Sequence, residues 1–116
     1  MKDEQSVLIW AKSKGIDAPE NAINQVKKTC EEVDELRIEI ESGNVEAAKM
    51  ELGDCLVTLT ILANQLGSNT DECLSLAYEK IKNRKGKTVD GTFVKISENV
   101  KQDEVVKLNE NDQNGA

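Results

Sequence analysis

The sequence predicts an all-α domain, and its composition is the first indication of this fold class. Aromatic residues make up 3% of the 116 residues, proline occurs once, and long stretches are rich in Leu, Ile, Ala, Glu and Lys. This composition is typical of helical proteins. A chain of this length is expected to form one domain, which we place at residues 1–97. Residues 98–116 are polar and charged, which predicts a disordered acidic tail.

The first two helices are predicted at residues 3–14 and 20–41. Gly15 ends the first helix, and Pro19 belongs to the first turn of the second. In the second helix, apolar residues recur at steps of three and four, as in an amphipathic helix: Ile23, Val26, Cys30, Val33, Leu36 and Ile40. The sequence Ser42-Gly43-Asn44 then predicts a tight turn.

The third helix, predicted at residues 45–66, is apolar on nearly all sides. Between Leu52 and Leu66 the only charged residue is Asp54. A helix of this kind is central in its domain or shared with a second subunit. Because an unpaired carboxylate in an apolar interior is costly, we expect Asp54 to have a partner.

A fourth helix is predicted from Asn69, which has capping-box spacing to Glu72, to about Lys85. Its inward-facing residues are expected to be Leu74, Ala77, Tyr78 and Ile81. A short β-hairpin at about residues 87–95 follows, since Asp90-Gly91 lies between β-forming residues.

Composition also restricts the function classes. The net charge is −7, so a general affinity for a nucleic-acid polymer is not expected. The absence of histidine excludes Cys-His and Ser-His catalysis and the Glu-x-x-His ligands of di-iron bundles. Cys30, Cys55 and Cys73 lack zinc or disulfide spacing, which predicts small, reduced core residues. We find no signal peptide and no apolar run near the ~20 residues that cross a bilayer, so a cytoplasmic protein without a membrane partner is expected.

Two predicted helices carry acidic residues three positions apart: Glu32 and Glu35 on the second, and Glu51 and Asp54 on the third. Residues at this spacing lie on one helix face. If the helices pack antiparallel across the predicted turn, the two pairs lie opposite each other. Four carboxylates so close would repel unless a cation lay between them, and all-oxygen ligands favour Mg²⁺ or Mn²⁺. Glu31 is the candidate general base.

Each of these features also has a structural interpretation. Acidic residues at this spacing are common on solvated helix faces, and the acids of the second helix flank its apolar stripe. Lys80, Asn83 and Arg84 suit phosphate binding, but basic residues at the end of a helix also interact favourably with the helix dipole. Trp10 is a candidate for stacking on a nucleobase, but a single tryptophan on a helix is more often an ordinary core residue.

Three segments occur in a recognisable order along the chain: Glu31-Glu32-Val33-Asp34-Glu35, Glu51-Leu52-Gly53-Asp54 and Lys80-Ile81-Lys82-Asn83-Arg84. Together they resemble the MazG-like branch of the all-α nucleoside triphosphate pyrophosphohydrolases. The resemblance covers roughly residues 10–84 and implies a bundle of four to five helices. Unlike two-domain relatives, the chain has one such domain, and its hairpin follows where many relatives end.

The resemblance implies a magnesium-dependent enzyme that cleaves a nucleoside triphosphate to the monophosphate and pyrophosphate, with house-cleaning of the nucleotide pool as its expected role. Its implied metal ligands are Glu32, Glu35, Glu51 and Asp54. Glu31 and Glu32 are the implied catalytic residues, and Lys80, Asn83 and Arg84 the implied ligands of the phosphates. Trp10 is a further substrate-binding candidate, proposed from its aromatic ring alone. A homodimer or homotetramer is expected by the same likeness. The alternative function is a non-catalytic, dimeric helical interaction module.

Overall fold

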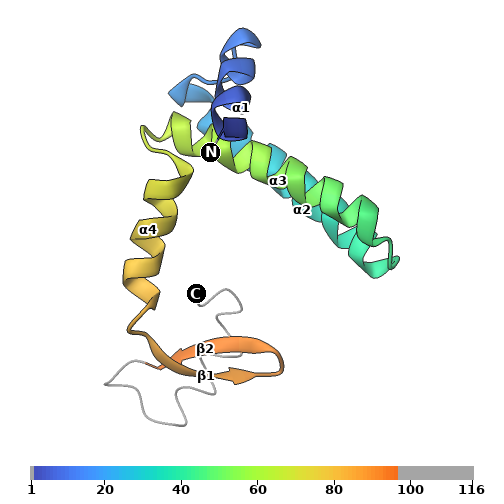
Figure 1. Cartoon of the computed structure of the whole chain (residues 1–116), viewed down its shortest axis with the longest axis vertical. Coiled ribbons are helices and arrows are strands. Elements are labelled where there is room, and N and C mark those ends of the chain that lie inside the picture. Colours follow the sequence, from blue (N-terminus) through green and yellow to red (C-terminus); the bar gives the residue numbers. More distant parts are fainter. Residues whose placement is uncertain (1, 97–116) are drawn as a thin grey trace. The chain divides into compact units, whose positions relative to one another are not determined.

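The computed structural model of the chain describes residues 2–96. This part contains four α-helices, a short 3₁₀ turn and a two-stranded antiparallel sheet (Figure 1). Their bounds are α1 (Lys2–Ser13), η1 (Pro19–Asn21), α2 (Ala22–Glu41), α3 (Val45–Gln65), α4 (Thr70–Ile81), β1 (Lys85–Val89) and β2 (Thr92–Ile96). The predicted fold class is confirmed. The tail predicted at residues 98–116 lies outside the described residues.

The chain divides into two compact units, Met1–Cys73 and Leu74–Ala116, and each is described by itself. The single domain expected at residues 1–97 stays a prediction. Within residues 2–96, no helix combines the length and the apolar character that crossing a membrane requires.

In the first unit, α2 and α3 form an antiparallel helical hairpin (Figure 1). Gly43 has a φ of +77°, a left-handed conformation that glycine adopts without steric cost. The side chain of Asn44 then accepts a hydrogen bond from the backbone N–H of Ala47 at 3.1 Å, which caps α3. The turn predicted from Ser42-Gly43-Asn44 is therefore confirmed, and it brings the acids of α2 and α3 onto adjoining helices.

The core of the first unit surrounds the C-terminal half of α3. Ile61 is 1% exposed, and the other residues buried here are Ala11, Gln25, Cys55, Thr58, Ala63 and Gln65. The Gln65 amide donates hydrogen bonds to the backbone oxygens of Ile16 at 2.9 Å and Ala18 at 3.3 Å, which fixes the α1–α2 connector against α3. The Gln25 amide donates to the backbone oxygen of Thr58 at 3.2 Å and joins α2 to α3.

Several residues expected in the core are exposed. Leu52, Leu56 and Leu59 on α3 are 49%, 56% and 43% exposed, so the described chain covers only part of this apolar helix. Of the three cysteines, all free thiols, Cys55 is buried whereas Cys30 and Cys73 are exposed. The prediction of three core cysteines was wrong for these two, because a helical period locates an apolar stripe but does not show what covers it.

Helix α4 begins as the capping pattern predicted and ends earlier than expected. The side chain of Asn69 accepts a hydrogen bond from the N–H of Glu72 at 2.8 Å, while the Glu72 carboxylate accepts one from the Ser68 hydroxyl at 2.6 Å. The helix ends at Ile81 rather than near Lys85, because residues from Lys85 onward pair in the sheet. The residues expected to face inward are exposed: Leu74, Ala77, Tyr78 and Ile81.

The predicted hairpin is present and slightly longer than expected. Asp90 and Gly91 have φ values of 49° and 80°, and Val89 pairs directly with Thr92 across this two-residue turn. Positive φ at both positions is what a tight hairpin turn requires, and Asp-Gly supplies it. A side chain at Gly86 would collide with the backbone oxygen of Val94 and the ring of Phe93, so glycine at this position permits the close pairing of the strands.

Candidate metal centre

Three carboxylates meet between α2 and α3. One oxygen from each of Glu32, Glu35 and Glu51 lies within 4.8 Å of the other two. Glu32 and Glu35 come from neighbouring turns of α2, and Glu51 approaches from α3 because the two helices are antiparallel. We call these three residues the acidic cluster. It brings together three of the four metal ligands that the resemblance implied.

Two oxygens of the acidic cluster are buried without a hydrogen-bond partner: Oε2 of Glu32 and Oε2 of Glu51. Glu32 is 8% exposed, whereas Glu35 is exposed and Glu51 is half-buried. Buried carboxylate oxygens nearly always have a donor or a cation as partner. The donor set consists of oxygen alone, which suits hard divalent cations. The residues present therefore fit a bound Mg²⁺ or Mn²⁺.

The electrostatics of the cluster also favour a cation. Removal from water raises the pKa of Glu51, and the negative charges of Glu35, Asp54 and Glu32 raise this pKa further. Burial raises the pKa of the Cys55 thiol, with smaller contributions from the acids Glu32, Glu51 and Asp54. The metal-free cluster thus disfavours full ionisation, and a divalent cation would relieve that repulsion.

Asp54 lies outside the group of three. It is exposed, and the expectation of a carboxylate in an apolar interior was wrong, because its neighbours Leu52 and Leu56 are exposed as well. Its charge nevertheless contributes to the raised pKa of Glu51, one helical turn earlier on α3. A role for Asp54 as a fourth ligand stays a prediction.

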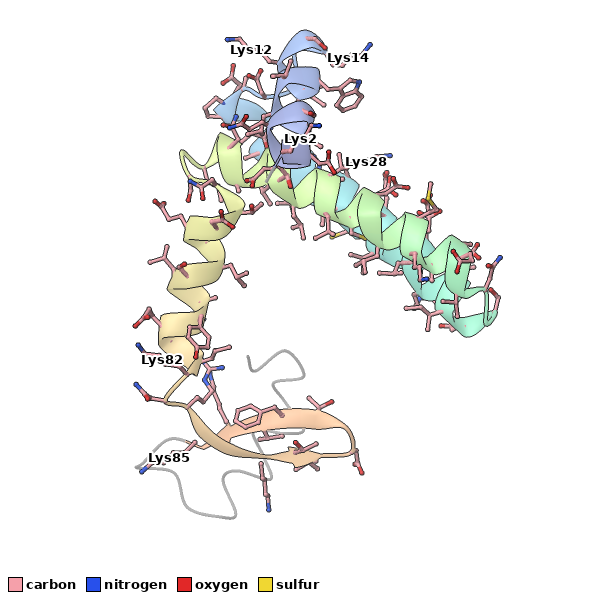
Figure 2. All side chains as sticks on the ribbon, viewed as in Figure 1. Lys2, Lys12, Lys14, Lys28, Lys82 and Lys85 are labelled. Atoms are coloured by element: carbon pink, nitrogen blue, oxygen red, sulfur yellow. The ribbon has the colours of Figure 1, made fainter. Side chains whose placement is uncertain are left out.

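Lys28 is a neighbour of the cluster that was not predicted from the sequence. Its ammonium lies 3.2 Å from Oε1 of Glu32 and 3.6 Å from Oε2 of Glu31 (Lys28 is labelled in Figure 2). A hydrogen bond to Glu32, with the charges of Glu32 and Glu31, raises the pKa of Lys28. Its position four residues before Glu32 could have predicted this ion pair, because residues four apart on a helix are neighbours.

A cavity of about 410 Å³ lies between α1 and α3 and is lined by Ser6, Val7, Trp10 and Val57. Trp10 is 49% exposed, so it is not an ordinary core residue. Val57 lies one turn beyond Asp54 on α3, which places the cavity about two turns from Glu51. An exposed aromatic ring beside an apolar hollow can stack on a planar ligand.

The predicted phosphate-binding residues lie in the second unit. Lys80 is in the last turn of α4, and Asn83 and Arg84 follow in the turn before β1. Lys82 and Lys85, labelled in Figure 2, lie on the same segment, where Lys82 forms an ion pair with Glu79 at 2.6 Å. A role of Lys80, Asn83 and Arg84 in substrate binding stays a prediction.

A comparison with protein families identifies the chain. The family model of the MazG nucleotide pyrophosphohydrolase domain matches residues 21–89, more than half of the chain. The chain belongs to this family. A search of curated proteins and a search of solved structures gave no significant match.

The match to the MazG domain includes all of the acidic cluster, together with Lys28, Glu31, Asp54 and the segment from Lys80 to Arg84. Trp10 lies before it. Membership indicates nucleotide pyrophosphohydrolase activity in general, and with it a nucleotide as substrate. Metal dependence is general in the MazG family and agrees with the acidic cluster found between α2 and α3.

Proposed function

We propose that the chain hydrolyses a ribo- or deoxyribonucleoside triphosphate to the nucleoside monophosphate and pyrophosphate in a magnesium-dependent reaction. Membership of the MazG family supports the reaction class. The observation that carries the metal requirement is the acidic cluster, whose oxygens lie within 4.8 Å of one another. The biological role that we propose is cytoplasmic house-cleaning of the nucleotide pool.

The proposed ligands of Mg²⁺, or alternatively Mn²⁺, are the three residues of the acidic cluster with Asp54 as a fourth. The partnerless oxygens of Glu32 and Glu51 support this assignment, since each needs a positive partner. When bound, the ion would offset the charge of the phosphates and make a nearby water more acidic. No histidine or cysteine ligand is needed for this chemistry.

Glu31 is the proposed general base. Its side chain is 67% exposed and adjoins Glu32, so its carboxylate is accessible to the water that attacks between the α and β phosphates. In this proposal a Glu31 oxygen accepts the proton that the water loses as its oxygen bonds to one of these two phosphorus atoms. The bridging P–O bond between the α and β phosphates breaks, and the nucleoside monophosphate and pyrophosphate leave. Glu32, the neighbouring carboxylate, would orient the same water.

The nucleoside would occupy the cavity beside Trp10. The ring of Trp10 is accessible, and Val57 connects the cavity to the helix that carries Glu51 and Asp54. Stacking on an aromatic ring accepts any base, because every base has a π-face. Lys80, Asn83 and Arg84 are the proposed ligands of the phosphates, with arginine suited to two-pronged contacts.

We further propose that the enzyme is a homodimer or homotetramer. The support is the exposed row of Leu52, Leu56 and Leu59 along α3, a spacing that places all three on one side of the helix. Such a row is unfavourable in water and is typical of an interface. Sedimentation velocity should give a mass at least twice that of the chain, and a monomer across the micromolar range would contradict this part of the proposal.

The reaction is tested with a panel of natural and oxidised nucleoside triphosphates, with and without Mg²⁺, scored separately for pyrophosphate and orthophosphate. We expect pyrophosphate from at least one substrate, only with the metal. Glu51→Gln should lower the rate at least about a hundredfold, because changes even to the partners of metal ligands cost tenfold to a hundredfold. Glu46→Gln is the matched control, since Glu46 is an exposed acid on the same helix, paired with Lys49.

Two results would overturn the proposal. Orthophosphate as the first product would assign a different bond cleavage. No product from any substrate, together with unchanged melting in the presence of a chelator, would favour the non-catalytic interaction module instead.

A further inference from the structure

The two oxygens of Glu32 have different surroundings. Oε1 forms an ion pair with the ammonium of Lys28 at 3.2 Å. Oε2 is buried and has no hydrogen-bond partner. The side chain of Glu32 is only 11% exposed, so water has little access to it. The carboxylate is thus held at one oxygen and unpaired at the other.

Lys28 also reaches the adjacent acid. Its ammonium lies 3.6 Å from Oε2 of Glu31, so one cation contacts both Glu31 and Glu32. The spacing explains this geometry, since residues three and four positions later on a helix lie on the same face as the first. Lys28 therefore contacts the proposed general base and one proposed metal ligand together.

We propose that Lys28 is a positioning residue, which holds Glu32 by Oε1 and leaves the buried Oε2 available to a cation in the acidic cluster, and which orients Glu31 beside it. This inference rests on the proposed function, because it concerns the readiness of the cluster for a divalent cation. Partners that hold a metal ligand from outside the coordination shell fix its orientation, and their loss typically weakens metal binding tenfold to a hundredfold.

Removing the charge of Lys28 has two opposing effects on the affinity of the acidic cluster for a divalent cation. The positive charge of Lys28 repels a second cation, so removing it would tighten metal binding on that ground alone. The side chain of Lys28 is 56% exposed, however, and water and salt screen that repulsion. The orientation of Glu32 is not screened in this way, because its side chain is only 11% exposed and the contact with Lys28 fixes the position of Oε1. We therefore expect orientation to dominate.

An ion pair on α3, between Lys49 and Glu46, provides the control for the ion pair of Lys28. Lys49 lies 3.3 Å from Glu46, its partner three residues earlier on α3, and both side chains are largely exposed. Exposed pairs of this kind contribute little to stability. Removing Lys49 changes the net charge of the protein as removing Lys28 does, but leaves the acidic cluster untouched.

The test measures the affinity of the full chain for Mn²⁺, without nucleotide, by the electron paramagnetic resonance signal of the free ion. We expect Lys28→Met, which keeps the aliphatic stem, to weaken Mn²⁺ binding about tenfold or more. Lys28→Arg should bind within about threefold of wild type because it retains the cation, and Lys49→Met should match wild type. Lys28→Gln serves as a second neutral variant, and circular dichroism establishes that each protein is folded.

The outcomes separate this inference from the proposed function. If wild type binds Mn²⁺ and both neutral variants bind it equally well or more tightly, the positioning role of Lys28 is refuted while the metal centre stands. That role is also refuted if Lys28→Arg loses as much affinity as Lys28→Met. If wild type itself binds no Mn²⁺, the metal centre of the proposed function fails, and the role of Lys28 fails with it.

Discussion

The two halves of α3 differ in what surrounds them. All of its buried residues lie in the C-terminal half, and they are Cys55, Thr58, Ile61, Ala63 and Gln65. That half packs against α1, α2 and the α1–α2 connector, whereas the N-terminal half, with Glu51 and Asp54, has α2 beside it (Figure 1). The comparison teaches that a core can fix one end of a helix while the other end, with the half-buried Glu51 and the exposed Asp54, is covered only in part.

The largest effect is expected at the centre of the packed half. Ile61→Ala should lower the free energy of unfolding by about 2–5 kcal/mol, because Ile61 is 1% exposed and the truncation leaves a cavity. Leu66→Ala is the control, since Leu66 is 67% exposed, and it should change stability by no more than about 0.5 kcal/mol. Urea unfolding followed by circular dichroism measures both. Equal losses would show that the two sites are packed alike.

A smaller loss is expected from the buried amide at the end of α3. Gln65→Met keeps much of the volume but leaves the carbonyls of Ile16 and Ala18 without their donor, at a cost of about 1–3 kcal/mol. Gln5→Met, at an exposed position on α1, is the matched control and should be nearly neutral. The same unfolding experiment applies. A neutral result for Gln65→Met would show that the connector is held by other contacts.

In the N-terminal half of α3, removing the charge of Glu51 should stabilise the metal-free protein. Because the pKa of Glu51 is raised on folding, the folded state binds more protons, and stability falls as pH rises from the ordinary carboxyl range through this raised pKa. Glu51→Gln removes that unfavourable charge, so its melting temperature at neutral pH with a chelator should exceed that of wild type.

The same variant should lose the stabilisation that Mg²⁺ gives to wild type. Glu46→Gln should follow wild type in both conditions, because Glu46 is exposed and paired with Lys49. A lower melting temperature for Glu51→Gln without metal would show that the acids of the cluster do not repel one another.

The smallest effect is expected at the contact between Glu4 of α1 and Thr70, the first residue of α4. The Thr70 hydroxyl donates a hydrogen bond to Glu4 at 2.7 Å, and its backbone N–H donates another at 3.3 Å; together they lower the pKa of Glu4. This contribution to stability is present above the ordinary Glu pKa of 4.5 and is lost as pH falls through the lowered value.

Thr70→Val should therefore reduce the loss of stability that occurs as pH falls from the ordinary Glu pKa of 4.5 through the lowered pKa of Glu4. Thermal melting across this range measures it. Thr60→Val is the control, because the Thr60 hydroxyl donates its hydrogen bond to a backbone oxygen of its own helix and not to a carboxylate. Identical acid profiles for wild type and Thr70→Val would contradict the role of this contact.

Local signals in the sequence predicted most helix boundaries. Gly15, Gly43 and Gly67 all adopt positive φ where a helix was expected to end, and Asp90-Gly91 forms the expected turn. Such signals depend on the backbone of a few neighbouring residues. The end of α4 was missed because the first strand begins earlier than the predicted hairpin, with Lys85 already paired to Ile96.

The candidate site was predictable in part. The spacing of Glu32, Glu35 and Glu51, with an antiparallel turn between the helices, was sufficient to bring these acids together. The exposure of Asp54 and of the α3 leucines was not predictable, because periodicity does not reveal which surfaces the rest of the chain covers. Lys28 was overlooked although its spacing to Glu32 was visible in the sequence.

The position of Trp10 has a practical consequence. It is the only tryptophan of the chain, is about half exposed, and lines the cavity between α1 and α3. Its ultraviolet emission therefore arises from one known place. A molecule that enters this hollow would change the polarity around a single indole, so titrations can be followed by intrinsic fluorescence in unlabelled protein.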